Sequence, residues 1–222
     1  NKMNKQLNPR QIKTIQNFWT WFQDNEQAIY NACKLEINKD EVLFHLERNL
    51  NYVSKRIEHF ITNHPQDENK LKVFFTAHGY RKLFPKMKAL EENISILEFF
   101  SIQVYITPFN TQEPTIPYNM VETIKNTFIK LEDYNTAAKK IILTLYCHEK
   151  IMQLNIKKVE RHAYLLLLFT LGEVKYKKHI YDFNCEVMPQ NTNGLLSLSE
   201  LPEFIDYLAK INYSRKLKIF FE

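Results

Sequence analysis

The sequence predicts an α+β protein in a single domain covering residues 1–222, with helices packed on a mainly antiparallel or mixed sheet. Two observations predict this class. Apolar residues recur three and four apart near the start of the chain, as in amphipathic helices. Further along, short alternating segments occur in pairs around polar turns, as in hairpins. With 45% hydrophobic residues, a chain of 222 residues can bury a sizeable core without disulfides or metals.

Two leading helices are expected. Asn8-Pro9 combines a capping residue with proline at the first helical position. From there Ile15, Trp19 and Phe22 fall on one face at helical spacing. A second helix is predicted over residues 39–54, with Leu46 in its buried stripe. Residues 1–8, which are polar, are expected to be disordered.

The rest of the chain alternates strands with helices, about six strands in all. Strands are predicted at 56–62, 70–77, 96–106, 126–133, 139–148 and 179–188. Helices are predicted at 80–92, at 155–171 with Gly172 as a C-cap, and at 199–210 with Ser199 as the N-cap. Three prolines make residues 107–117 a long loop.

The order of these elements suggests an internal repeat. After the two leading helices, strand-strand-helix-strand occurs twice, although no residue-level similarity links the two copies. An alternative organisation therefore has two sub-lobes, residues 9–110 and 111–222. Adjacent hairpins favour antiparallel pairing with helices on one face.

Composition excludes several classes of function. With only 3 glycines, the chain has no Gly-rich phosphate loop or dinucleotide fingerprint. The formal net charge of +5 is spread over both halves of the chain, which disfavours nucleic acid as the main partner. Cys33, Cys147 and Cys185 are far apart and predict buried thiols in a reducing compartment. We expect a cytoplasmic protein without a membrane span, a metal site or a cofactor.

Two candidate site residues stand at element ends. His78 precedes Gly79 in a turn between a strand and a helix, where an acid, a base or an anion contact often lies. The alternative is an exposed turn histidine. Glu173 follows Gly172 at a helix end, where the helix dipole disfavours an acidic side chain. It is either functional or paired with a nearby lysine.

The remaining candidates are on the two leading helices. His45, Arg48 and Tyr52 share the face of the second helix opposite its buried stripe, and Arg56 follows. This face either meets phosphates or an acidic partner, or is simply solvated. Trp21 falls off the apolar face of the first helix. It either anchors a protein partner or packs under the 107–117 loop.

Several segments together resemble an uncharacterised bacterial protein family, of Bacteroidetes or Proteobacteria type. They are Phe18–Phe22 with Asn25-Glu26, Phe75–Gly79 followed by Leu83-Phe84-Pro85, Leu171–Glu173, His179–Phe183 and Leu198–Leu208. The resemblance implies a shared fold and a cytoplasmic bacterial setting, and it supplies no activity, substrate or cofactor. Similar sequences place an acidic residue at the position of His78, so a role resting on a carboxylate there would not carry over.

Three functions compete on this evidence. The first is a non-catalytic intracellular binding protein, with another protein as the partner and an oligomeric state that the sequence leaves open. It rests on abundant aromatics and on a chain without a nucleophile–base pair. The second is an enzyme with a dispersed site around His78, Tyr80 and Glu173. The third is a weak nucleic-acid binder that uses the Arg48, Tyr52 and Arg56 face.

Overall fold

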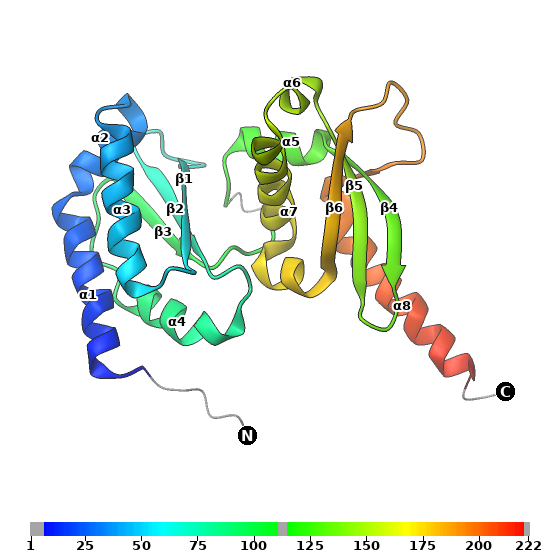
Figure 1. The fold of residues 1–222 in the computed structure, drawn as a ribbon, viewed down its shortest axis with the longest axis horizontal. Helices are drawn as coiled ribbons and strands as arrows, with labels where there is room; N and C mark the ends of the chain where they lie inside the picture. The colour runs from blue at the N-terminus through cyan, green and yellow to red at the C-terminus, as the bar shows by residue number, and fades with distance from the viewer. Residues whose placement is uncertain (1–6, 111–114, 220–222) are drawn as a thin grey trace. The chain divides into compact units, whose positions relative to one another are not determined.

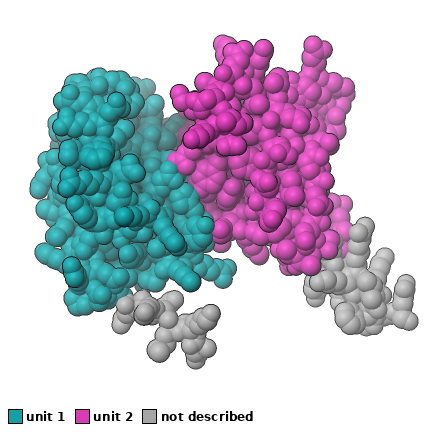
Figure 2. Space-filling view, viewed as in Figure 1, with its two compact units in different colours: residues 1–106, 114–117 teal, residues 107–113, 118–222 magenta. Residues whose placement is uncertain are grey.

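A computed structural model shows an α+β protein whose strands form two separate mixed sheets (Figure 1). The structure describes residues 7–110 and 115–219, with side chains described up to Ile211. The chain divides into two compact units, coloured separately in Figure 2. Unit 1 contains residues 1–106 and 114–117, and unit 2 contains residues 107–113 and 118–222.

Unit 1 packs its helices on a three-stranded sheet (Figure 1). Its elements are α1 (Pro9–Asp24), α2 (Glu26–Leu35), α3 (Lys39–Val53), β1 (Glu58–Asn63), β2 (Leu71–Thr76), η1 (Arg81–Leu83), α4 (Phe84–Glu92) and β3 (Phe100–Val104). Strand β2 is central, antiparallel to β1 and parallel to β3.

The core of unit 1 is aromatic. Trp19 and Phe22 of α1 are buried against Phe75 of β2 and Phe100 of β3, with rings meeting edge to face. Such pairs add roughly 0.5–1.5 kcal/mol beyond the area they bury. The indole Nε1 of Trp19 donates to the Leu90 carbonyl at 2.8 Å, which ties α1 to α4. This packing holds the helices rigidly over the sheet that carries the candidate site.

Unit 2 is built on a four-stranded sheet with the order β6-β5-β4-β7. Its elements are α5 (Tyr118–Asn126), β4 (Phe128–Asn135), β5 (Lys140–Cys147), α6 (Glu149–Met152), α7 (Ile156–His179), β6 (Ile180–Val187), β7 (Leu196–Ser197), η2 (Leu198–Glu200) and α8 (Leu201–Ile219). Helix α7 packs on β5 and β6, and α8 packs on α7.

The two units share one strand topology. In unit 1, β1 and β2 form an antiparallel hairpin, and a helical crossover leads to β3 parallel to β2. In unit 2, β4 and β5 form the hairpin, and a helical crossover leads to β6 parallel to β5. The repeat suggested by the sequence is therefore present in the fold, and β2 corresponds to β5.

Several predicted elements differ from the observed ones. The first predicted helix is two helices, because the backbone leaves the helical conformation at Asn25 (φ −108°, ψ 9°). Gly172 does interrupt α7, at φ 71° and ψ 156°, but the chain resumes a helix as far as His179. The last helical segment is capped by Ser197, not Ser199. Helices α5 and α6 and the two-residue strand β7 were not predicted.

The predictions of fold class, of a disordered N-terminus and of a chain without a membrane span can be compared with the described residues. The α+β class is confirmed, and the strands divide between two sheets instead of one. Of residues 1–8, expected to be disordered, residues 1–6 are outside the described part, whereas Asn8 caps α1. Within the described residues, none of the helices has the length and apolar character needed to cross a membrane.

Candidate functional site

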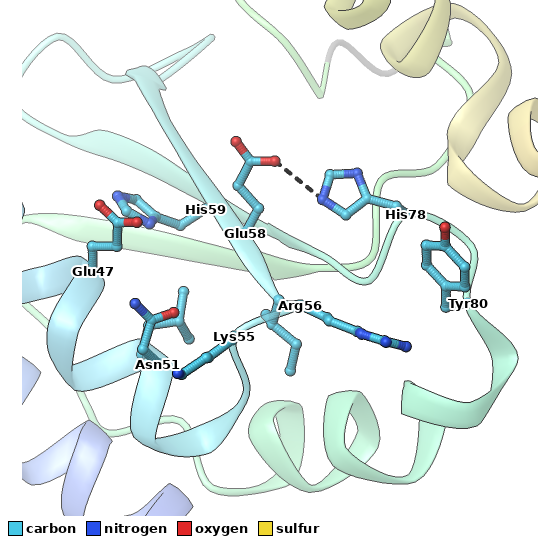
Figure 3. A pocket seen from close by; sticks show the side chains of 10 residues that line it. Glu47, Asn51, Lys55, Arg56, Glu58, His59, His78 and Tyr80 are labelled. Atoms are coloured by element: carbon cyan, nitrogen blue, oxygen red, sulfur yellow. Dashed lines mark ion pairs between the residues drawn. The ribbon is translucent and has the colours of Figure 1, made fainter.

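The candidate site is a cavity of about 720 Å³ in unit 1. It lies beside the carboxyl end of β2, between the end of α3, the start of β1 and the turn that follows β2 (Figure 3). In sheets with parallel strands, ligands commonly bind at the carboxyl ends of those strands. Its lining residues are Glu47, Leu50, Asn51, Lys55, Arg56, Ile57, Glu58, His59, His78 and Tyr80.

A tight turn places His78 in this cavity. The Tyr80 N–H donates to the Ala77 carbonyl at 3.0 Å, and the two central residues, His78 and Gly79, have φ of 52° and 71°. Positive φ at both central positions is the pattern of a type I′ turn, which glycine enters without cost. A side chain at the His78 position costs about 1–2 kcal/mol in this conformation. Non-glycine residues in this region often cluster at functional sites.

Glu58 fixes the imidazole of His78. The Nε2 of His78 and the Oε2 of Glu58 are 3.0 Å apart (Figure 3). Glu58 is opposite Thr76 in the β1–β2 register, so the hairpin places its carboxylate next to the turn. The hydroxyl of Thr76 accepts a hydrogen bond from the His78 N–H at 2.9 Å, which anchors the turn itself. The two site residues are therefore positioned by neighbouring strands.

Two cations face the same cavity. Lys55 and Arg56 are in the short connection between α3 and β1 (Figure 3). Among the described residues, neither their ammonium nor their guanidinium group is in an ion pair. At the negative C-terminal end of α3, Lys86 donates a hydrogen bond to the Val53 carbonyl at 2.7 Å. This cation, and not Lys55 or Arg56, therefore interacts with the last turn of the helix. Both cations remain available to a ligand.

A second histidine, His59, lines the opposite side of the site next to Glu47 (Figure 3). Burial lowers the pKa of His59, and the nearby carboxylates of Glu58 and Glu47 only partly offset that effect. The imidazole of His59 is therefore neutral near pH 7, and it can form hydrogen bonds with a ligand without adding a positive charge to those of Lys55 and Arg56.

No protein-family model, curated protein or solved structure matches this chain. Across the described residues, groups of three or more His, Cys, Asp or Glu side chains placed to hold a metal ion are absent. The side chains that line the site include Lys55 and Arg56, the Glu58–His78 pair and Tyr80.

The predicted face of α3 is only partly in the site. Arg56 lines the cavity, whereas His45, Arg48 and Tyr52 are exposed elsewhere on α3 and do not line it. Arg48 donates its Nε to the Tyr52 hydroxyl at 3.3 Å. The nucleic-acid hypothesis also draws on the tail residues Arg215, Lys216 and Lys218, whose side chains lie outside the described part of the chain.

Trp21 and Glu173 lie outside the cavity of unit 1. Trp21 is half-buried and packs against the core of unit 1. Glu173 is fully buried in unit 2, immediately after the kink at Gly172. His78 and Tyr80 line the cavity in unit 1, so the third member of the dispersed site, Glu173, belongs to the other unit.

Sequence reasoning missed Glu58, which takes the position next to His78. The signal was available in the predicted hairpin, because strands at 56–62 and 70–77 joined by a turn place residue 58 opposite the end of the second strand. Lys55 was missed because an exposed lysine between two elements carries no pattern of its own.

Unit 2 contains a corresponding cavity of about 560 Å³. It lies between the end of α5, the start of β4 and the end of β5, the same position in the repeat as the cavity of unit 1. Its lining residues are Glu122, Thr123, Asn126, Thr127, Phe128, Cys147, His148, Lys150, Ile151, His162, Met188 and Thr192. It lacks the counterpart of the Glu58–His78 pair and presents a thiol and a thioether instead.

Proposed function

We propose that this protein is a non-catalytic binding protein whose unit 1 cavity holds an anionic group, a phosphate or a carboxylate, of a small molecule. The observation that carries the proposal is the presence of Lys55 and Arg56, without ion pairs among the described residues, beside the Glu58–His78 pair. Arg56 supplies a planar fork that matches either anion with two hydrogen bonds. Lys55 supplies a point charge.

The Glu58–His78 pair has a defined part in this proposal. Glu58 holds the imidazole of His78 in one orientation at the wall of the cavity, beside the two cations that would bind the anion. Tyr80, which follows the same turn, also lines the cavity. Because these groups come from the β1–β2 hairpin and the segments that flank it in unit 1, the fold of that unit preorganises the site.

Calorimetric titration of the full chain with inorganic phosphate, pyrophosphate and citrate tests the proposal. We expect binding of at least one of these probes, weakened about tenfold or more by Arg56→Gln, since hydrogen bonds to charged groups contribute about 1.5–3 kcal/mol. Arg48→Gln is the matched control, because Arg48 is an exposed arginine on the neighbouring helix α3, carries the same charge and does not line the cavity.

The outcomes separate the competing functions. Loss of binding in Arg56→Gln but not in Arg48→Gln supports the cavity. Equal losses in both variants, with a steep salt dependence toward an oligonucleotide, would instead support the nucleic-acid hypothesis. Absence of binding to all three probes would refute an anion site. The cytoplasmic location and the bacterial origin that the resemblance implies belong to the same proposal.

A second candidate function is general acid–base catalysis by His78. The observation that favours it is the 3.0 Å contact with Glu58, which orients the imidazole as a carboxylate does in hydrolytic enzymes. It differs from the dispersed site expected from the sequence, since Glu58 takes the position assigned to Glu173. Turnover of a phosphate or carboxylate ester that is abolished by His78→Gln while ester binding persists would establish it. Turnover that is unchanged in His78→Gln would refute catalysis by His78.

A further inference from the structure

The strand register relates the cavities of the two units residue by residue. The first strand of each hairpin begins with Glu58 in unit 1 and with Phe128 in unit 2. Glu58 is opposite Thr76, and Phe128 is opposite Tyr146. Both first-strand residues line the cavity of their own unit. Phe128 therefore takes the position of Glu58, and an apolar ring replaces the carboxylate.

The neighbouring positions of the two cavities can be compared in the same way. Two residues before the first strand, Asn126 takes the position of Arg56, and each lines its own cavity. Two residues after the partner of that strand's first residue, His148 takes the position of His78. The unit 2 cavity thus keeps the histidine, whereas an amide replaces the guanidinium group.

The unit 2 cavity also carries fewer charges than its counterpart. Among the described residues that line it, Glu122 and Lys150 are the charged ones. The Oε1 of Glu122 is 3.5 Å from the Nζ of Lys125, so this carboxylate already has a cation beside it. The unit 1 cavity presents Lys55 and Arg56 together, and the described lining of unit 2 presents a single lysine. An uncharged ligand fits this second lining better than an anion does.

Three apolar side chains from separate elements line the unit 2 cavity. Phe128 begins β4, Ile151 is in α6, and Met188 directly follows β6. Each of them is only partly buried, so each retains apolar surface that a ligand can cover. Covering apolar surface favours binding. Phenyl rings and thioethers both make favourable contacts with an aromatic ring, so an aromatic ligand suits this wall.

The polar side chains on the α5 side of the cavity bind the backbone of that segment. The hydroxyl of Thr123 donates to the Asn119 carbonyl at 2.7 Å, and the hydroxyl of Thr127 donates to the Thr123 carbonyl at 2.8 Å. The amide of Asn126 donates to the Glu122 carbonyl at 2.9 Å. These hydrogen-bond donors are therefore used within the protein.

The imidazoles of His148 and His162 line the same cavity and differ in what they can bind. The Nδ1 of His148 accepts the Lys150 N–H at 3.2 Å, so the proton of that ring is on Nε2 and the ring can only donate further. Burial lowers the pKa of His162, so its ring is neutral near pH 7 and one of its nitrogens is an acceptor. His162 can therefore accept an N–H or O–H group from a ligand.

We propose that the unit 2 cavity binds a small, uncharged aromatic molecule that carries one N–H or O–H group, of the size of an indole or a phenol. The ring covers Phe128, Ile151 and Met188, and the N–H or O–H group donates to His162. A cavity of about 560 Å³ is within the range of small-molecule sites. This site is separate from the anion cavity of unit 1 and does not depend on it.

Titration of the isotope-labelled full chain with indole, followed by nuclear magnetic resonance, tests the site. We expect saturable shifts centred on Phe128, His148, Ile151 and His162. Indene has the same shape without the N–H group, and it should bind about fivefold more weakly because one neutral hydrogen bond is lost. His162→Leu should abolish the preference for indole over indene.

A pair of isoleucine variants tests the apolar wall. Ile151→Ala should weaken indole binding about tenfold, because the ring loses much of the apolar surface that it covers. Ile156→Ala is the matched control, since Ile156 is an exposed isoleucine at the start of α7 that does not line the cavity. It should bind indole as the wild type does.

Four results would overturn the proposal. Shifts that do not saturate up to the solubility limit of indole would show that the cavity does not hold the ring, and shifts centred in unit 1 would place the ring elsewhere. Equal affinities for indole and indene would contradict the hydrogen bond to His162. Equal losses in Ile151→Ala and Ile156→Ala would contradict the apolar wall. The first three are observed on the wild-type chain, so they do not depend on the folding of any variant.

Discussion

The turn that presents His78 provides the sharpest stability prediction. His78 has φ of 52°, a conformation that costs a residue with a Cβ atom about 1–2 kcal/mol and glycine almost nothing. Glycine in turn costs about 0.4–1 kcal/mol through the greater freedom of the unfolded chain. His78→Gly should therefore be more stable than His78→Ala by about 1 kcal/mol, although glycine removes one more atom.

The stability of the wild type relative to these two variants depends on a second contribution, the contact between His78 and Glu58. Both variants lose the contact with Glu58, and since the two side chains are 25% and 35% exposed, that contact contributes no more than about 1 kcal/mol. His78→Ala should lose that contribution in full. His78→Gly should fall close to the wild type, because relief of the backbone offsets the loss. Both variants should lose anion binding.

Urea unfolding followed by tryptophan fluorescence measures this difference. Both tryptophans, Trp19 and Trp21, are in unit 1, so the signal reports the unit that contains the turn. With a typical slope of about 1–2 kcal/mol per molar urea, the two midpoints should differ by about 0.5–1 M.

The matched control is Lys88, an exposed residue in the interior of α4. There the order should reverse, because glycine within a helix costs about 1 kcal/mol relative to alanine. If His78→Ala proves as stable as His78→Gly while the Lys88 pair behaves normally, the left-handed turn is not the source of the effect and the reasoning fails.

Three further outcomes follow from buried groups. Glu26→Ala should destabilise unit 1 by about 2 kcal/mol in the same assay, because the Phe99 N–H loses its acceptor at 2.6 Å. Glu26→Gln keeps an acceptor oxygen and should destabilise the unit less. Equal destabilisation by the two variants would contradict the prediction. Burial lowers the pKa of His59, so the unfolded chain is protonated at a higher pH than the folded protein, and the urea midpoint should fall as pH decreases below about 6.5. His59→Gln should reduce this dependence of the midpoint on pH. An unchanged dependence in the variant would refute the prediction. Gly172→Ala, at φ 71° and ψ 156°, should lower the unfolding temperature of unit 2, followed by circular dichroism, more than Gly194→Ala at an open surface site; the opposite order would disprove it.

Much of the fold was predictable because local patterns determine it. Hairpins at 56–62 with 70–77 and at 126–133 with 139–148 were found from alternation around polar turns, and both occur. The repeat of strand-strand-helix-strand followed from their order. Division into two sheets did not, because alternation within a strand says nothing about which strands pair across a crossover.

The errors have physical causes of the same kind. The break at Asn25 was missed because the apolar spacing continues across it, and nothing local marks the change of direction. Helix α5 follows a proline-rich loop whose composition concealed it. For the site, His78 was identified from its turn, but its partner Glu58 and the cations Lys55 and Arg56 meet it only through tertiary structure.

Backbone chemical shifts of the isotope-labelled full chain during a phosphate titration test the central claim most directly. The structure predicts saturable shifts centred on Arg56, Glu58, His78 and Tyr80 in unit 1, with Arg48 and Tyr52 unaffected. Shifts that spread along the exposed face of α3, or none at concentrations that saturate the calorimetric signal, would contradict an anion-binding cavity at the end of β2.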